Sequence, residues 1–146
     1  MNEKEKDTQF KNKLSEALTM PNLELKVTGL ILLFDKVIKE KDPKKIVKVG
    51  KELLEYLDED INERIIGAGV TLDIAEKNLS IERDFDEEDE EKKLYASIVD
   101  EGLSRTEESI ERLKYLLKKR KEAERVVRKV ERFLRKEFEI REKEKK

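Results

Sequence analysis

Residues 30–38 read LILLFDKVI, the most apolar stretch of the chain. Five apolar residues in a row precede Val37 and Ile38, so a helix formed here is apolar on more than one side. Such a helix is typical of a protein interior. We therefore predict a helix over residues 22–39 and place it at the centre of the core.

Proline positions divide the chain on either side of this helix. Pro21 ends a helix predicted over residues 7–20, because proline lacks the N–H that a helix interior needs. Asp42 and Pro43 supply an N-cap and a first helical residue for a third helix, which runs to about residue 58.

Asp60 and Glu63 have the spacing of a capping box and predict the start of a fourth helix. Its apolar residues are separated alternately by four and three positions: Ile61, Ile65, Ala68, Leu72, Ala75 and Leu79. The connections are short, so the second, third and fourth helices should be antiparallel neighbours.

Residues 80–86 are expected to form a loop, with Asp86 as the N-cap of the next helix. From residue 87 to 146 there is no proline, and apolar residues return at heptad a and d positions. Gly102 is the weak point. Since Ser104 and Glu107 have capping-box spacing, the segment is either two helices or one long helix through Gly102.

The composition indicates an all-α protein and removes most catalytic chemistry. Charged residues make up 48% of the 146 residues, but Leu, Ile, Val and Phe still supply about 29%, above the roughly 20% below which disorder is expected. The chain has no Cys and no His, which excludes thiol nucleophiles, His-based triads and zinc sites. High Lys and Glu content also fits a thermophilic source.

We predict one domain over residues 1–146, comprising a helical core (1–79), the loop (80–86) and a long C-terminal helical segment (87–146). The fold class is an irregular antiparallel bundle of five or six helices whose last helix has coiled-coil character. No apolar run is long enough for a membrane span, so we expect a cytoplasmic protein.

The formal net charge of −2 conceals segregation along the chain. Residues 55–92 hold 15 acids and 4 bases, whereas residues 111–146 hold 16 bases and 8 acids. Seven cations of the last segment recur at helical spacing with no acid among them: Lys114, Lys118, Lys121, Arg125, Arg128, Arg132 and Arg135.

Three interpretations of these cations compete. They are the solvated side of a helix, with Glu122, Glu124 and Glu131 as ion-pair partners. They meet an acidic surface, either residues 55–92 or those of another copy. Or they bind the phosphates of nucleic acid, although no aromatic residues are interleaved for base stacking.

Two further motifs are assigned structural roles. Gly67 and Gly69 resemble the start of a phosphate loop, but no strand precedes them and Leu72 stands at the third glycine position. We expect these small residues, like Ala96, Gly102 and Ser109, to let a neighbouring helix approach closely. The acidic run 84–91 lacks the ligand spacing of a calcium loop and is expected to stabilise a helix N-terminus.

The sequence therefore predicts a non-enzymatic interaction or assembly protein that self-associates or docks a protein partner through its C-terminal helix. A nucleic-acid-associated protein is the alternative. We expect no catalytic residues, metal, cofactor, small-molecule substrate or membrane contact.

Overall fold

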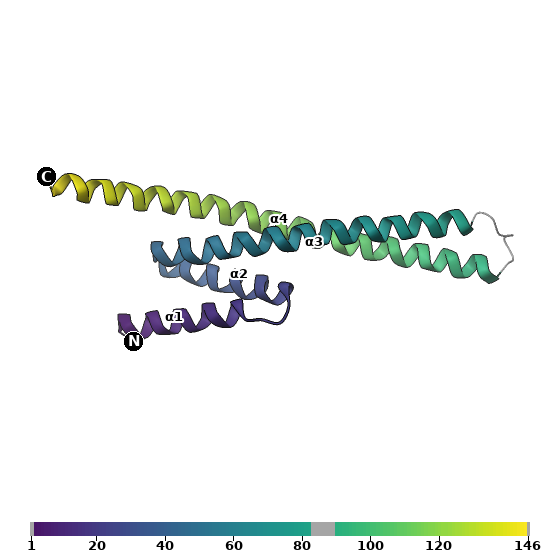
Figure 1. Ribbon diagram of the computed structural model, residues 1–146, viewed down its shortest axis with the longest axis horizontal. Coiled ribbons are helices and arrows are strands. Elements are labelled where there is room, and N and C mark those ends of the chain that lie inside the picture. Colours follow the sequence, from purple (N-terminus) through teal and green to yellow (C-terminus); the bar gives the residue numbers. More distant parts are fainter. Residues whose placement is uncertain (1, 83–89, 146) are drawn as a thin grey trace. The chain divides into compact units, whose positions relative to one another are not determined.

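The computed structural model describes residues 2–82 and 90–145, and these residues form four helices with no strand. They are α1 (Glu3–Leu18), α2 (Leu23–Glu40), α3 (Pro43–Glu82) and α4 (Glu90–Glu144) (Figure 1). The all-helical class and the long C-terminal helix are confirmed. The predicted number of five or six helices is wrong for the described residues.

The third and fourth predicted helices are one helix, α3, of 40 residues. The prediction of Asp60 as an N-cap is wrong, because Asp60 lies inside α3, where it is buried and no helix begins. A capping box allows a helix to begin but does not force the preceding helix to end, and neither glycine nor proline separates Leu57 from Ile61.

The predicted boundaries in the second half also change. Ser80 and Ile81 are helical rather than part of a loop, whereas residues 83–86, including the proposed cap Asp86, lie outside the described residues. Gly102 does not break α4, so of the two alternatives the continuous helix is correct. Side chains on both sides of Gly102 keep the heptad pattern, so the helix continues in spite of its cost of about 1 kcal/mol relative to alanine.

Side-chain caps begin both α2 and α3, and the cap predicted at Asp42 is confirmed. The Asn22 side chain accepts a hydrogen bond from the Leu25 N–H at 2.9 Å and begins α2. Asp42 accepts from the Lys45 N–H at 3.2 Å, and Pro43 is the first residue of α3. Lys41, the residue before Asp42, is the C-cap of α2 and has a left-handed backbone conformation (φ 57°).

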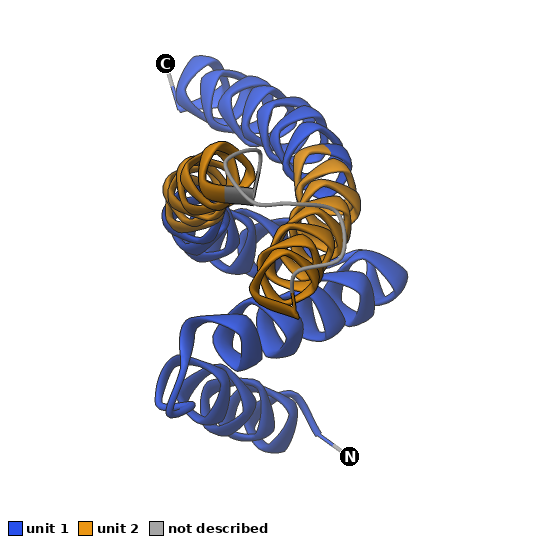
Figure 2. Ribbon diagram, turned by 90° about the vertical axis from the view of Figure 1, so that its right-hand side faces the viewer, with its two compact units in different colours: residues 1–60, 118–146 blue, residues 61–117 orange. Residues whose placement is uncertain are grey.

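The helices form two compact units (Figure 2). Unit 1 contains residues 1–60 and 118–146, and thus α1, α2, the first part of α3 and the last part of α4. Unit 2 contains residues 61–117, the remaining parts of α3 and α4. The units do not follow the division expected from chain order, and the single domain stays a prediction.

In unit 1, α2 is the central helix, as predicted. Six of its side chains are buried: Val27, Leu30, Ile31, Leu33, Phe34 and Val37. Gly29 of α2 lies against Ala17 of the antiparallel α1, where an added Cβ would stand 3.2 Å from the Ala17 Cβ (Figure 1).

Gly50 of α3 marks the place where three helices of unit 1 meet. A Cβ at this position would overlap Cγ2 of Val127 on α4 and would stand 3.0 Å from Cε2 of Phe34 on α2. Val127 is β-branched and stiff, and Phe34 is a buried ring, so neither gives way easily. Glycine is required here by packing, not by backbone conformation.

We predict that Gly50→Ala destabilises the protein although alanine is the better helix former. Overpacking costs about 1–3 kcal/mol, which exceeds the propensity gain of about 1 kcal/mol. The matched control is Gly67→Ala, also inside α3, where a Cβ meets nothing within 4 Å. Chemical denaturation should show a lower midpoint for Gly50→Ala and a higher one for Gly67→Ala; equal shifts would contradict the packing assignment.

Candidate interaction surfaces

The seven predicted cations all lie on α4 with exposed side chains. Lys114 belongs to unit 2, whereas the other six, from Lys118 to Arg135, belong to unit 1. They occupy the b and f positions of the heptad, which point away from the a and d positions that hold Ala123 and Val127 in the core. We call the six residues of unit 1 the basic face.

Neighbouring acids neutralise part of the basic face. Arg128 pairs with Glu124 at 2.6 Å, and Arg135 pairs with Glu131 at 3.9 Å. The remaining four have no ion pair within 4.0 Å among the described residues: Lys118, Lys121, Arg125 and Arg132. The flanking glutamates therefore explain the sequence pattern only in part.

One described ion pair joins the acidic segment, residues 55–92, to the basic segment, residues 111–146. Asp58 of α3 bonds to Arg120, which also pairs with Glu124 at 3.0 Å. The Asp58 carboxylate raises the pKa of the Arg120 guanidinium by hydrogen bonding and by charge. Arg120 is not part of the basic face; it occupies a seam position that the heptad pattern predicts should be apolar.

In unit 2, α3 and α4 run antiparallel side by side (Figure 1), and small residues meet at Gly102. A Cβ at Gly102 would lie 3.5 Å from the Cβ of Ala75 and 3.8 Å from Cγ2 of Thr71. Thr106, one turn further along α4, is buried and donates its hydroxyl to the Gly102 carbonyl at 2.8 Å. Gly102 thus faces α3 as predicted, at a distance where a Cβ would make ordinary contact, whereas the predicted packing role of Gly67 and Gly69 is wrong within the described residues, because both face open space.

Besides the buried Ile61, Val99 and Leu116, unit 2 has six large aliphatic side chains that lie beside this seam. They are 36% to 55% exposed and recur every seven residues: Ile65, Leu72 and Leu79 on α3, and Leu103, Ile110 and Leu117 on α4. The sequence pattern had placed the α3 residues in one stripe with Ile61, Ala68 and Ala75. The structure separates the two sets, since Ile61 and Ala75 are buried.

When the residues of the seam are assigned heptad positions a and d, these six residues occupy e positions. In an antiparallel pair, one helix is reversed, so the e positions of both helices lie on the same side of the seam. The register at Gly102 and Ala75 places Leu72 level with Leu103, and Ile65 level with Ile110. We call the six residues the flanking apolar face.

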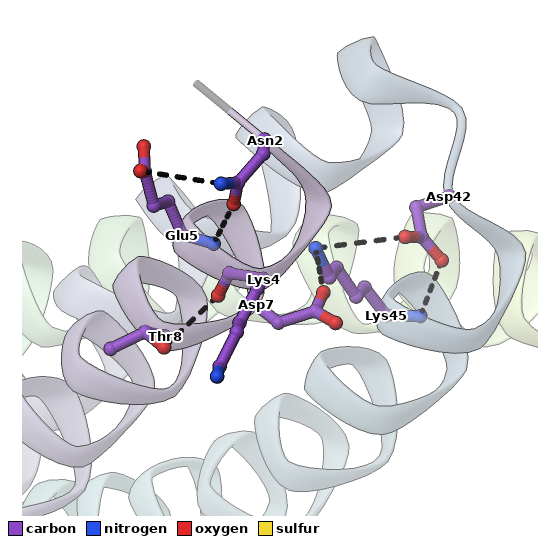
Figure 3. A network of polar contacts seen from close by, with 7 residues as sticks. All are labelled: Asn2, Lys4, Glu5, Asp7, Thr8, Asp42 and Lys45. Carbon is purple, nitrogen blue, oxygen red and sulfur yellow. Dashed lines mark hydrogen bonds and ion pairs between the residues drawn. The ribbon is translucent and has the colours of Figure 1, made fainter.

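Near the N-terminus, Lys45 connects α1 to α3 (Figure 3). Its ammonium group lies 3.1 Å from Asp7, 3.7 Å from Asp42 and 5.2 Å from the centre of the Phe10 ring. The hydrogen bond to Asp7 raises the pKa of Lys45, against the opposing effect of burial.

Comparisons with known proteins add no family: no family model, curated protein or solved structure matches the chain. None of the described helices has a stretch long and apolar enough to cross a membrane. No cluster of three or more acidic side chains suited to a metal ion occurs in residues 2–82 and 90–145, and most of the acidic run 84–91 lies outside them.

We predict that Asp7→Asn lowers stability at pH 7 by less than about 1 kcal/mol, because Asp7 is 59% exposed and water screens the pair. A lysine pKa that is raised on folding stabilises the protein below the ordinary value of about 10.4 and loses that effect as the pH rises through the folded value. The difference between wild type and variant should therefore shrink above about pH 10.4. Additive losses in Asp7→Asn, Lys45→Gln and the double variant would contradict the coupling.

Proposed function

We propose that the protein is a non-enzymatic assembly protein that pairs with a second copy of itself through the flanking apolar face of unit 2. The supporting observation is the row of half-exposed leucine and isoleucine side chains in this unit. Glycine, alanine and threonine meet in the seam at Gly102, and the six leucine and isoleucine side chains of the flanking apolar face lie beside it, 36% to 55% exposed. A cytoplasmic location is part of the same proposal.

A second copy suits this surface better than a single peptide does. The flanking apolar face spans both helices, so two such faces placed against each other form a four-helix arrangement with self-complementary contacts. By contrast, the outward aliphatic residues Ile66 and Val70 of α3 have no similar row on the outer side of α4.

Gly69 supports the close approach of a helix from a second copy to the surface of α3. It lies between Ile65 and Leu72 on the surface of α3, and a Cβ there meets nothing within 4 Å. A glycine inside a helix costs about 1 kcal/mol relative to alanine, and nothing in the described chain compensates for that cost. A helix from a second copy that contacts the bare backbone would do so.

The free energy of burying the flanking apolar face predicts a dimer whose formation depends on protein concentration. Burying a half-exposed aliphatic side chain contributes about 1 kcal/mol, so twelve such side chains in a symmetric pair contribute on the order of 12 kcal/mol. Association itself costs about 4–15 kcal/mol. Removing four of the twelve side chains should therefore weaken pairing about a thousandfold, at 1.4 kcal/mol per tenfold.

We predict that light scattering shows a mass rising with concentration from one chain, 17.3 kDa, toward twice that value. The double variant Leu72→Gln, Leu103→Gln should keep the mass of one chain, with its helix content unchanged by circular dichroism. The control Ile66→Gln, Val70→Gln changes exposed aliphatic residues outside the face and should still pair. A wild type that is monomeric at every concentration, or equal loss in the control, would overturn the proposal.

A second candidate function is the binding of a polyanion such as nucleic acid by the basic face. It is favoured by the four exposed cations that no described acid neutralises. Six phosphate contacts would give a slope of about −5 in the logarithm of affinity against the logarithm of salt concentration.

We predict that generic DNA or RNA is retarded in a low-salt shift assay by the wild type and not by a variant with Lys118, Lys121, Arg125 and Arg128 changed to Glu. The control changes four exposed lysines elsewhere in unit 1 to Glu, with the same change in net charge: Lys4, Lys11, Lys39 and Lys48. No retardation of nucleic acid by the wild type, or the same loss in the control, rejects this function.

A further inference from the structure

Unit 1 contains a cavity of about 500 Å³ between α1, α2 and the first turn of α3. Four lysines line it: Lys6, Lys13, Lys36 and Lys45. Sites for small molecules have volumes of about 300–1,000 Å³, so this lysine cavity is large enough for a small organic ligand. It involves neither the flanking apolar face nor the basic face.

The charges around the lysine cavity balance in number but are not all paired. Asp7 and Asp42 neutralise Lys45 at 3.1 and 3.7 Å. Glu3 and Glu40 also line the cavity, but no ion pair within 4.0 Å joins any described acid to Lys6, Lys13 or Lys36. Three lysines and two glutamates thus line one space without forming ion pairs with one another.

Two of these ammonium groups, on different helices, lie close enough to perturb each other. The interaction with Lys13 is the largest cause of the lowered pKa of Lys36, followed by burial. Lys45 adds repulsion, and Glu40 acts in the opposite direction. An anion placed between Lys13 and Lys36 would convert this repulsion into two favourable contacts.

The floor of the lysine cavity is apolar. Leu33 and Val37 of α2 line it, and Phe10 of α1 adds a ring. Lys6, Phe10 and Lys13 follow each other at intervals of four and three residues, so they share one side of α1. The cavity therefore presents cations beside an apolar surface and suits a ligand with both characters.

We propose that the lysine cavity binds a small organic phosphate ester, with the phosphate between Lys13 and Lys36 and the apolar part against Phe10 and Leu33. A phosphate monoester has three free oxygens and nearly two negative charges at neutral pH, which matches three ammonium donors better than a carboxylate does. Lysine binds phosphate as a point charge and needs no planar geometry.

The test is calorimetric titration of the full chain with phenyl phosphate, with inorganic phosphate as a second arm. We expect phenyl phosphate to bind at least tenfold more tightly than inorganic phosphate, because only the ester covers the apolar floor. Equal affinities would overturn the role of the floor, and no heat of binding for either ligand would overturn the site.

The variant Lys13→Gln, Lys36→Gln should weaken phenyl phosphate binding at least tenfold. Its matched control is Lys11→Gln, Lys39→Gln, which removes two exposed lysines from the same helices but outside the cavity. Equal weakening in the control would show general charge attraction and reject the site. Neither variant changes the flanking apolar face, so light scattering on the same samples reports self-association independently.

Discussion

The uninterrupted course of α3 and α4 is the constraint on which the other features depend. Pro43 is the first residue of α3, and no proline occurs later in either helix, so nothing forces the chain out of helical geometry between Pro43 and Glu82 or between Glu90 and Glu144. Helices of 40 and 55 residues present side chains on every side. The chain supplies only two further described helices to cover them, and both belong to unit 1.

The neighbours of Gly50 and Gly102 show that the length of α3 and α4 has different consequences in the two units. At Gly50 the space that glycine leaves is filled by Val127 and Phe34, so three helices of unit 1 enclose large apolar side chains. At Gly102 the neighbours are Ala75 and Thr71 of one helix only. Two helices cannot surround every bulky residue between them, so the six residues of the flanking apolar face lie beside the seam, 36% to 55% exposed, where only a further element can cover them.

Periodicity alone predicted most of the helices, but it could not assign their faces. The alternating spacing from Ile61 to Leu79 is satisfied both by a and d positions and by a and e positions, which differ only in where the partner helix lies. Ile65 and Leu72 therefore appeared to be core residues, and their exposure became evident only from the pairing with α4. Asp60 was misassigned for a related reason, because a capping signal is effective only where the helix already ends. The basic face was predictable because exposed cations need no partner to define them.

On α4, the flanking apolar face and the basic face occupy different heptad positions, and the two surfaces respond differently to salt. Burial of aliphatic side chains is not weakened by salt, whereas attraction between exposed charges is screened beyond about 8 Å at physiological ionic strength. The proposed pairing uses six residues of unit 2, whereas the basic face belongs to unit 1, so no residue serves both proposals. The two proposed functions thus use different residues of α4, and ionic strength distinguishes them: rising salt would release a bound polyanion and preserve the assembly.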